Sequence, residues 1–140
     1  MFFDETKFLI EKIEYQSIEL DEEDTPEQRV SVHDEYFIRT CEDDRLVIEI
    51  QRRIAFEPPG VFELSVVALL DNHIDKERSD KFANAEEIRD YVLDHIYDVI
   101  SNSGIMAEVS LIIANITSSF GRVPIILPPD LILDETTGQD

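Results

Sequence analysis

Hydrophobic and polar residues alternate along the first half of the chain in a way that predicts β-strands. The clearest segment is residues 45–56, whose alternate positions are apolar: Leu46, Ile48, Ile50, Ile54 and Phe56. Most of the intervening positions are polar, so the strand would bury one face and expose the other to water. Arg52 lies on the buried parity, where it would mark a sheet edge or form an ion pair.

Three further segments carry a strand-like composition. Residues 7–20, 30–41 and 61–70 are rich in β-branched and aromatic residues. In the last of these segments, one parity is apolar throughout: Phe62, Leu64, Val66, Ala68 and Leu70. The first of them also fits a helix, but its three-and-four spacing fails after Tyr15. Between the last two strands, Glu57-Pro58-Pro59-Gly60 predicts a turn or a bulged crossing. Four consecutive strands with short connections predict an antiparallel meander.

The second half of the chain predicts helices. Residues 71–81 are polar and indicate a linker, after which Asn84 and Glu87 have the spacing of a capping box. A helix would start there and continue until the break at residues 101–104. A second helix, residues 105–120, is enclosed by Gly104 and Gly121. Residues 122–133 then form an apolar, proline-rich extended segment, and residues 134–140 are expected to be a frayed tail.

The helix over residues 105–120 is apolar nearly all round. One stripe has helical spacing and contains Met106, Val109, Ile113, Ile116 and Phe120, yet Leu111, Ile112 and Ala114 lie off that stripe. A helix of this kind must be covered on two sides. We therefore expect one side to pack on the subunit's own sheet and the other on a second subunit, through Leu111, Ile112 and Asn115. The run is too short and too rich in Ser, Thr and Asn to span a membrane.

These elements predict an α+β fold: one domain over residues 1–140, with a four-stranded antiparallel sheet and C-terminal helices packed on one face. Composition changes this picture only through charge. Twelve basic and 32 acidic residues give a net charge of −20. Such a field repels phosphate backbones and anionic lipid, so we expect neither nucleic acid nor a membrane as partner. Basic partners fit better, although the acidity could simply keep an oligomer soluble.

Candidate catalytic chemistry is sparse. The three histidines, His33, His73 and His95, are scattered and lack metal-ligand spacing. The sequence has no phosphate-cradling glycine loop, and Cys41 has no neighbouring base to favour a thiolate. We therefore expect a non-enzyme without cofactor or metal. Because Cys41 is the only cysteine and the first residues are acidic, we also expect a cytoplasmic protein.

The order of these elements and two local strings resemble the SecB family of export chaperones. The first string is residues 57–64, EPPGVFEL, which is similar to the family's pattern of two polar residues, Gly, an aliphatic residue, Phe and another aliphatic residue. The second is residues 119–127, SFGRVPIIL, similar to its Ser-x-Gly-x-x-Pro-x-Leu segment. Three departures indicate a divergent member. Pro128 follows Ile126-Leu127 without the family's Asn, Ser103-Gly104 replaces a Cys-Pro pair, and the last helix is expected to be short or absent.

The resemblance implies a homotetramer, a dimer of dimers with the main helices at the interface, that holds unfolded polypeptide clients without ATP. It also implies an acidic sheet face for a motor protein, although the departures leave open whether that partner is the translocase motor SecA or a toxin-antitoxin component. Apolar grooves would take extended client segments. Our candidates for client binding are Phe56, Val61, Phe62, Ile125 and Leu127.

Two other functions stay open from the sequence. The same oligomer could be a dedicated binding module for one partner, such as a toxin, an antitoxin or another basic protein. Alternatively, the α+β domain could bind a small ligand or act as an enzyme, with the apolar C-terminal segment closing a pocket.

Overall fold

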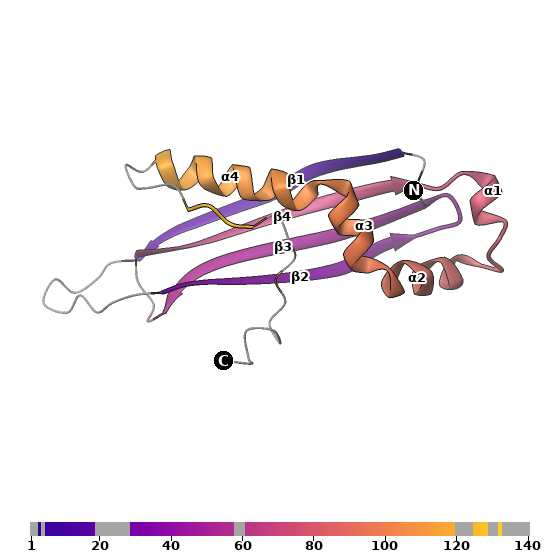
Figure 1. Ribbon diagram of the computed structural model, residues 1–140, viewed down its shortest axis with the longest axis horizontal. Coiled ribbons are helices and arrows are strands. Elements are labelled where there is room, and N and C mark those ends of the chain that lie inside the picture. The colour runs from indigo at the N-terminus through magenta and orange to yellow at the C-terminus, as the bar shows by residue number, and fades with distance from the viewer. Residues whose placement is uncertain are drawn as a thin grey trace, which may run out of the picture.

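The computed structural model describes residues 3, 5–18, 29–57, 61–119, 125–128 and 132, and shows a sheet with helices on one face (Figure 1). The strands are β1 (Glu5–Ile18), β2 (Arg29–Cys41), β3 (Arg45–Glu57) and β4 (Val61–His73). The helices are α1 (Lys76–Ser79), α2 (Ala85–Asp94), α3 (Ile96–Ser103) and α4 (Ile105–Ser119). The predicted turn at residues 58–60 and the tail at residues 134–140 lie outside the described residues.

The strand order in the sheet is β1-β4-β3-β2, and all neighbours are antiparallel. A meander is therefore correct for β2, β3 and β4 but wrong for β1, which pairs with β4. Ten residues separate β1 from β2 in the sequence, and a chain can span about 3.3 Å per residue. That reach exceeds the roughly 14 Å across three inter-strand spacings. In this order, β1 covers the edge of β4 and places Ile10 opposite Ala68.

The core lies between the sheet and the helices, and the predicted parity of β3 and β4 is confirmed. The apolar residues chosen by alternation are at most 1% exposed, apart from Phe56, which is half-buried. The helices contribute residues that are also nearly inaccessible: Ile88, Val92, Ile100, Met106, Val109 and Ile113. Each such side chain contributes about 1.5–3 kcal/mol by leaving water.

One helix predicted after Asn84 is in fact two, so that prediction is corrected. The cap itself is confirmed, because the Asn84 side chain accepts a hydrogen bond from the Glu87 N–H at 3.0 Å. The helical geometry then fails at His95, whose φ of −118° and ψ of 22° end α2 and start α3. The break lets both Val92 before it and Ile96 after it reach the core, where they are 0% and 4% exposed.

Residues 71–81 are not a plain linker. Strand β4 continues to His73, Ile74 is 1% exposed, and Asp75 caps the short helix α1 by accepting a hydrogen bond from the Arg78 N–H at 2.9 Å. A buried isoleucine and a capping aspartate therefore order a segment whose composition is otherwise polar.

Gly104 separates α3 from α4. Its φ of 77° lies in the left-handed region that favours glycine, and the two helices are bent there by 57°. The core stripe of α4 is confirmed by Met106, Val109 and Ile113, each at most 1% exposed; Phe120 lies outside the described residues. Within the described part of the chain, no single helix is long and apolar enough to cross a membrane, and only the bent pair α3–α4 meets that test on length and composition.

Candidate functional site

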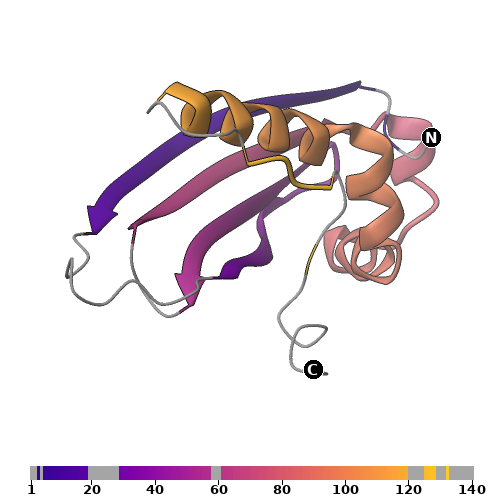
Figure 2. The same ribbon diagram turned by 60° about the vertical axis from the view of Figure 1, so that its left-hand side comes forward.

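The helix-covered face of the sheet also carries an extended piece of the chain's own C-terminal segment. Residues 125–128 and 132 are here called the C-terminal strap. Residues 125–128 lie beside α4 on this face (Figure 2), and Ile132 is bonded to Asp34 of β2. Ile125 and Leu127 are half-buried against the core, whereas Ile126 between them is 76% exposed. This alternation is that of an extended segment with one side on an apolar surface and the other in water.

Main-chain hydrogen bonds fix the strap. The Ile125 N–H donates to Thr117 Oγ1 at 2.9 Å, and the Pro128 carbonyl accepts from Arg52 Nη1 at 3.2 Å and from Ser110 Oγ at 3.3 Å. Ile132 bonds twice to one residue: its N–H donates to Asp34 Oδ2 and its carbonyl accepts from the Asp34 N–H, each at 2.7 Å. The strap is therefore bound in the manner of an extended peptide.

Arg52 and Asp34 anchor this arrangement as a buried ion pair. Arg52 donates from Nε to Asp34 Oδ1 at 2.8 Å and from Nη2 to Asp34 Oδ2 at 2.7 Å, and both side chains are 0% exposed. Of the two interpretations of Arg52, the ion pair is confirmed. Asp34 was missed by the sequence analysis, although it lies opposite Arg52 in the β2–β3 register. The sequence did contain a signal for Asp34, because it is an acidic residue at an inward-facing position of β2. That signal points to Arg52 only once the β2–β3 register is known.

The candidate client-binding residues lie around the same core but are not equally accessible. Phe62 is 1% exposed, stacked on Tyr15 at 5.3 Å between ring centroids and in edge contact with the half-buried Phe56 at 5.1 Å. Phe62 is therefore a core residue in this arrangement. Ile125 and Leu127 belong to the strap itself, and the side chain of Val61 lies outside the described residues. Their role in client binding stays a prediction.

The residues predicted to form an oligomer interface lie on the outer side of α4. Leu111 is 56% exposed, Asn115 is exposed and Ile112 is half-buried. Helix α4 runs along edge strand β1 in both views, and β1 exposes Phe8 and Ile13 at 45% each (Figures 1 and 2). Apolar side chains thus remain in water on both elements, as the sequence analysis expected for α4, and what covers them stays a prediction.

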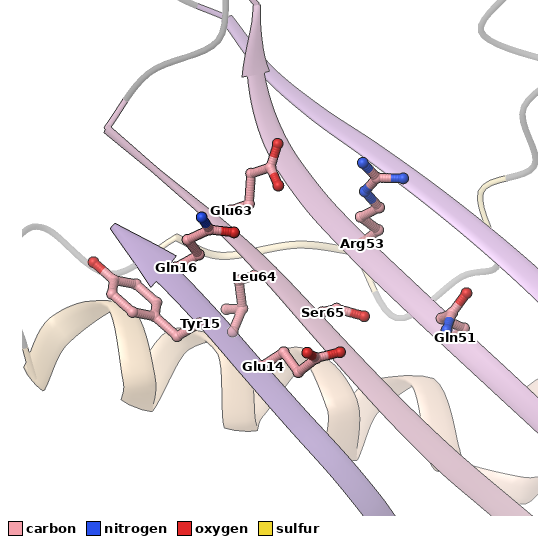
Figure 3. Close-up of a pocket in the computed structure, with 8 residues that line it drawn as sticks. All are labelled: Glu14, Tyr15, Gln16, Gln51, Arg53, Glu63, Leu64 and Ser65. Atoms are coloured by element: carbon pink, nitrogen blue, oxygen red, sulfur yellow. The ribbon is translucent and has the colours of Figure 1, made fainter. Parts of the chain in front are cut away.

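The opposite face of the sheet has a shallow hollow of about 510 Å³ (Figure 3). Its polar lining comes from three strands and mixes both signs of charge: Glu14, Gln16, Gln51, Arg53, Glu63 and Ser65. The Asp34–Arg52 pair is absent from this lining, because it faces the helices. Among the described residues, no group of three or more His, Cys, Asp or Glu side chains is placed to hold a metal ion.

An antiparallel sheet in the order β1-β4-β3-β2, with a long C-terminal helix on one face, is the SecB-like fold. A solved structure with this fold is that of Mycobacterium tuberculosis Rv1957, a SecB-like chaperone in complex with a ChAD peptide from the Rv1956 HigA1 antitoxin. It matches with a TM-score of 0.57 and 12% sequence identity, over 87% of this chain and 83% of that chain. No family model matches the sequence, and no curated protein sequence matches it. The fold expected from the SecB resemblance is confirmed.

Proposed function

We propose that this protein is a SecB-like chaperone that binds extended segments of other polypeptides. The observation that carries the proposal is the docking of the strap, because the helix-covered face holds an extended apolar segment through its main chain. The fold supports it, since the Rv1957 chaperone with the same fold is solved with a bound peptide. We infer binding rather than catalysis, in the cytoplasm, without a nucleotide or another cofactor.

The test is suppression of aggregation. The purified protein is mixed with an unrelated unfolded protein, and light scattering is followed without nucleotide. A holding chaperone lowers the scattering at near-stoichiometric amounts. Unchanged scattering together with one strongly bound protein recovered from the native cell would instead favour a dedicated partner, as the antitoxin peptide of Rv1957 suggests for that protein. No suppression and no bound polypeptide would contradict the proposal.

We also propose that the protein self-associates as a dimer of dimers, and that the apolar surface formed by Phe8, Ile13 and Leu111 is one of the two interfaces that such a tetramer needs. These three side chains are 45%, 45% and 56% exposed. Covering a large apolar side chain contributes about 1.5–3 kcal/mol, and a two-fold interface would cover each of them twice. The summed free energy gained by covering these side chains is large enough to offset part of the entropy lost on association.

Leu111→Asp tests this surface, because a carboxylate there would lose hydration on association. We expect the solution mass from light scattering to fall from that of four chains to that of two, because the second interface of the tetramer is unchanged. Asn102→Asp, at an exposed position on α3, adds the same charge elsewhere and should leave the mass unchanged. A Leu111→Asp variant with the mass of the parent protein would show that this side of α4 is not an interface.

A further inference from the structure

The strap is recognised through its backbone. Each hydrogen bond described between the strap and the rest of the chain uses a strap main-chain atom: the N–H groups of Ile125 and Ile132 and the carbonyls of Pro128 and Ile132. Every residue has a carbonyl, and every residue except proline has an N–H. The hydrogen bonds that hold the strap therefore depend little on its side chains.

The groups that receive the strap are fixed in advance. Asp34 and Arg52 hold each other through two hydrogen bonds, and Arg52 Nη1 is positioned further by Ser110 Oγ at 3.0 Å. All three residues are at most 9% exposed. Arg52 Nη1 then presents a buried donor, and Asp34 presents a buried acceptor at Oδ2 beside the donor of its own N–H. Buried polar groups need partners, so this cluster requires a polypeptide backbone or water on it.

The side chains of the strap add a loose apolar preference. Ile125 and Leu127 are half-buried against the core, and Ile126 points into water. An extended segment from another protein with apolar residues at alternate positions would meet the same surface in the same way. Such segments are what an unfolded polypeptide offers.

We propose that Arg52, Asp34 and Ser110 form a main-chain clamp for extended apolar polypeptide, that the strap fills this clamp in the free protein, and that a client segment displaces the strap. The proposal rests on the proposed function and adds to it the site of binding and its regulation. The strap acts as an internal competitor. The apparent affinity for a client is therefore the intrinsic affinity multiplied by the fraction of molecules whose clamp is free.

The experiment uses the full chain and the variant Ile132→Pro, which lacks the N–H that donates to Asp34 Oδ2. Amide hydrogen exchange first reports whether the strap is released, because the Asp34 N–H donates to the Ile132 carbonyl. We expect faster exchange at Asp34 in this variant. Ile126→Ser, at the 76% exposed strap position, is the matched control and should exchange at Asp34 like the parent.

The probe is a fluorescent peptide with the sequence of residues 123–133 and two added lysines for solubility. It should bind Ile132→Pro about tenfold more tightly than the parent, because the internal competitor is weakened, and it should bind Ile126→Ser like the parent. Equal affinities, or unchanged exchange at Asp34 in Ile132→Pro, would overturn the clamp. A peptide that binds none of the three proteins would overturn it as well.

A reduced, carboxymethylated protein, which stays unfolded, is then added as a client. Its binding separates the clamp proposal from the proposed function. If it displaces the peptide and accelerates exchange at the Ile125 and Ile132 N–H groups of the parent, which lose their acceptors when the strap leaves, a client uses the clamp. If it binds the parent but leaves exchange at these two N–H groups unchanged, the clamp proposal fails and the proposed function stands. If it does not bind while the peptide shows its tenfold preference, the proposed function fails and the clamp serves only the chain's own strap.

Discussion

The two faces of the sheet each carry an arginine–carboxylate pair at 2.7 Å, and the two pairs have opposite surroundings. On the helix-covered face, Arg52 and Asp34 are 0% exposed. On the open face, Arg39 of β2 and Glu11 of β1 are 44% and 38% exposed, although these strands are the two edges of the sheet. The same bond length therefore describes a pair that is removed from water and a pair that is not.

The open-face pair depends on two irregularities in the sheet. The β1–β4 register shifts between Ile10 and Lys12, and the β2–β3 register shifts between Ile38 and Thr40. The extra residues at these bulges are Glu11 and Arg39 themselves. Their side chains meet above the two central strands, and Arg39 also lies 3.6 Å from Glu49 Oε1.

Some apolar side chains on this open face are nearly inaccessible to solvent. Val47 and Val67, on the outward parity of β3 and β4, are only 5% and 6% exposed. Long polar side chains can cover apolar neighbours with their aliphatic parts. Burial, rather than distance, therefore distinguishes the two ion pairs: Arg52–Asp34 is buried and bonded to the strap, whereas Arg39–Glu11 is exposed to solvent.

The largest expected effect is that of Arg52→Leu. Removing the guanidinium leaves the Asp34 carboxylate buried without its charge partner, which typically costs about 3–5 kcal/mol of unfolding free energy. Chemical denaturation followed by circular dichroism measures this loss. Arg39→Leu is the matched control on the open face and should cost far less, with an effect that shrinks further at high salt. Equal losses in the two variants would remove the distinction between the faces.

An intermediate effect is expected from Val67→Ala. Although Val67 lies on the open face, it is 6% exposed, and removing two buried carbon groups at about 0.8 kcal/mol each should cost about 1.5 kcal/mol. Val30→Ala, at a position that is 44% exposed, should cost much less in the same denaturation experiment. A Val67→Ala variant as stable as the parent would mean that the open face does not bury its apolar residues in solution.

The smallest effect concerns pH. Arg45 donates to Asp71 through two hydrogen bonds of 3.0 Å, which hold the pKa of Asp71 below its ordinary value of 3.8 in the folded protein. The unfolded chain therefore binds the proton more readily. The stability contributed by this pair is fully present above pH 3.8 and is lost as the pH falls through the lowered pKa.

Asp71→Asn should accordingly be slightly less stable than the parent at neutral pH, and the difference should vanish as the pH is lowered past that range. Thermal melts over a pH series measure it. Because Asp71 is 43% exposed, solvent screening keeps the effect small. A stability difference that grows toward low pH would contradict the direction of the shift.

The sequence by itself determined the elements that repeat over short distances. Alternation located all four strands and identified the buried parity of β3 and β4, and the helical stripe of α4 was correct through Met106, Val109 and Ile113. These patterns can be recognised because side chains return to the same face about every 2 residues in a strand and about every 3.6 residues in a helix. One face of each element must be buried, so its apolar residues recur at that spacing.

Only the tertiary structure decided which elements meet. The position of β1 beside β4, the pairing of Asp34 with Arg52, and the docking of the strap at Asp34 join residues far apart in the chain, as in the bond between Ile132 and Asp34 across 98 positions. No local periodicity encodes such partners. They follow from the packing of whole faces and from the requirement that a buried charge find both a counter-charge and hydrogen bonds.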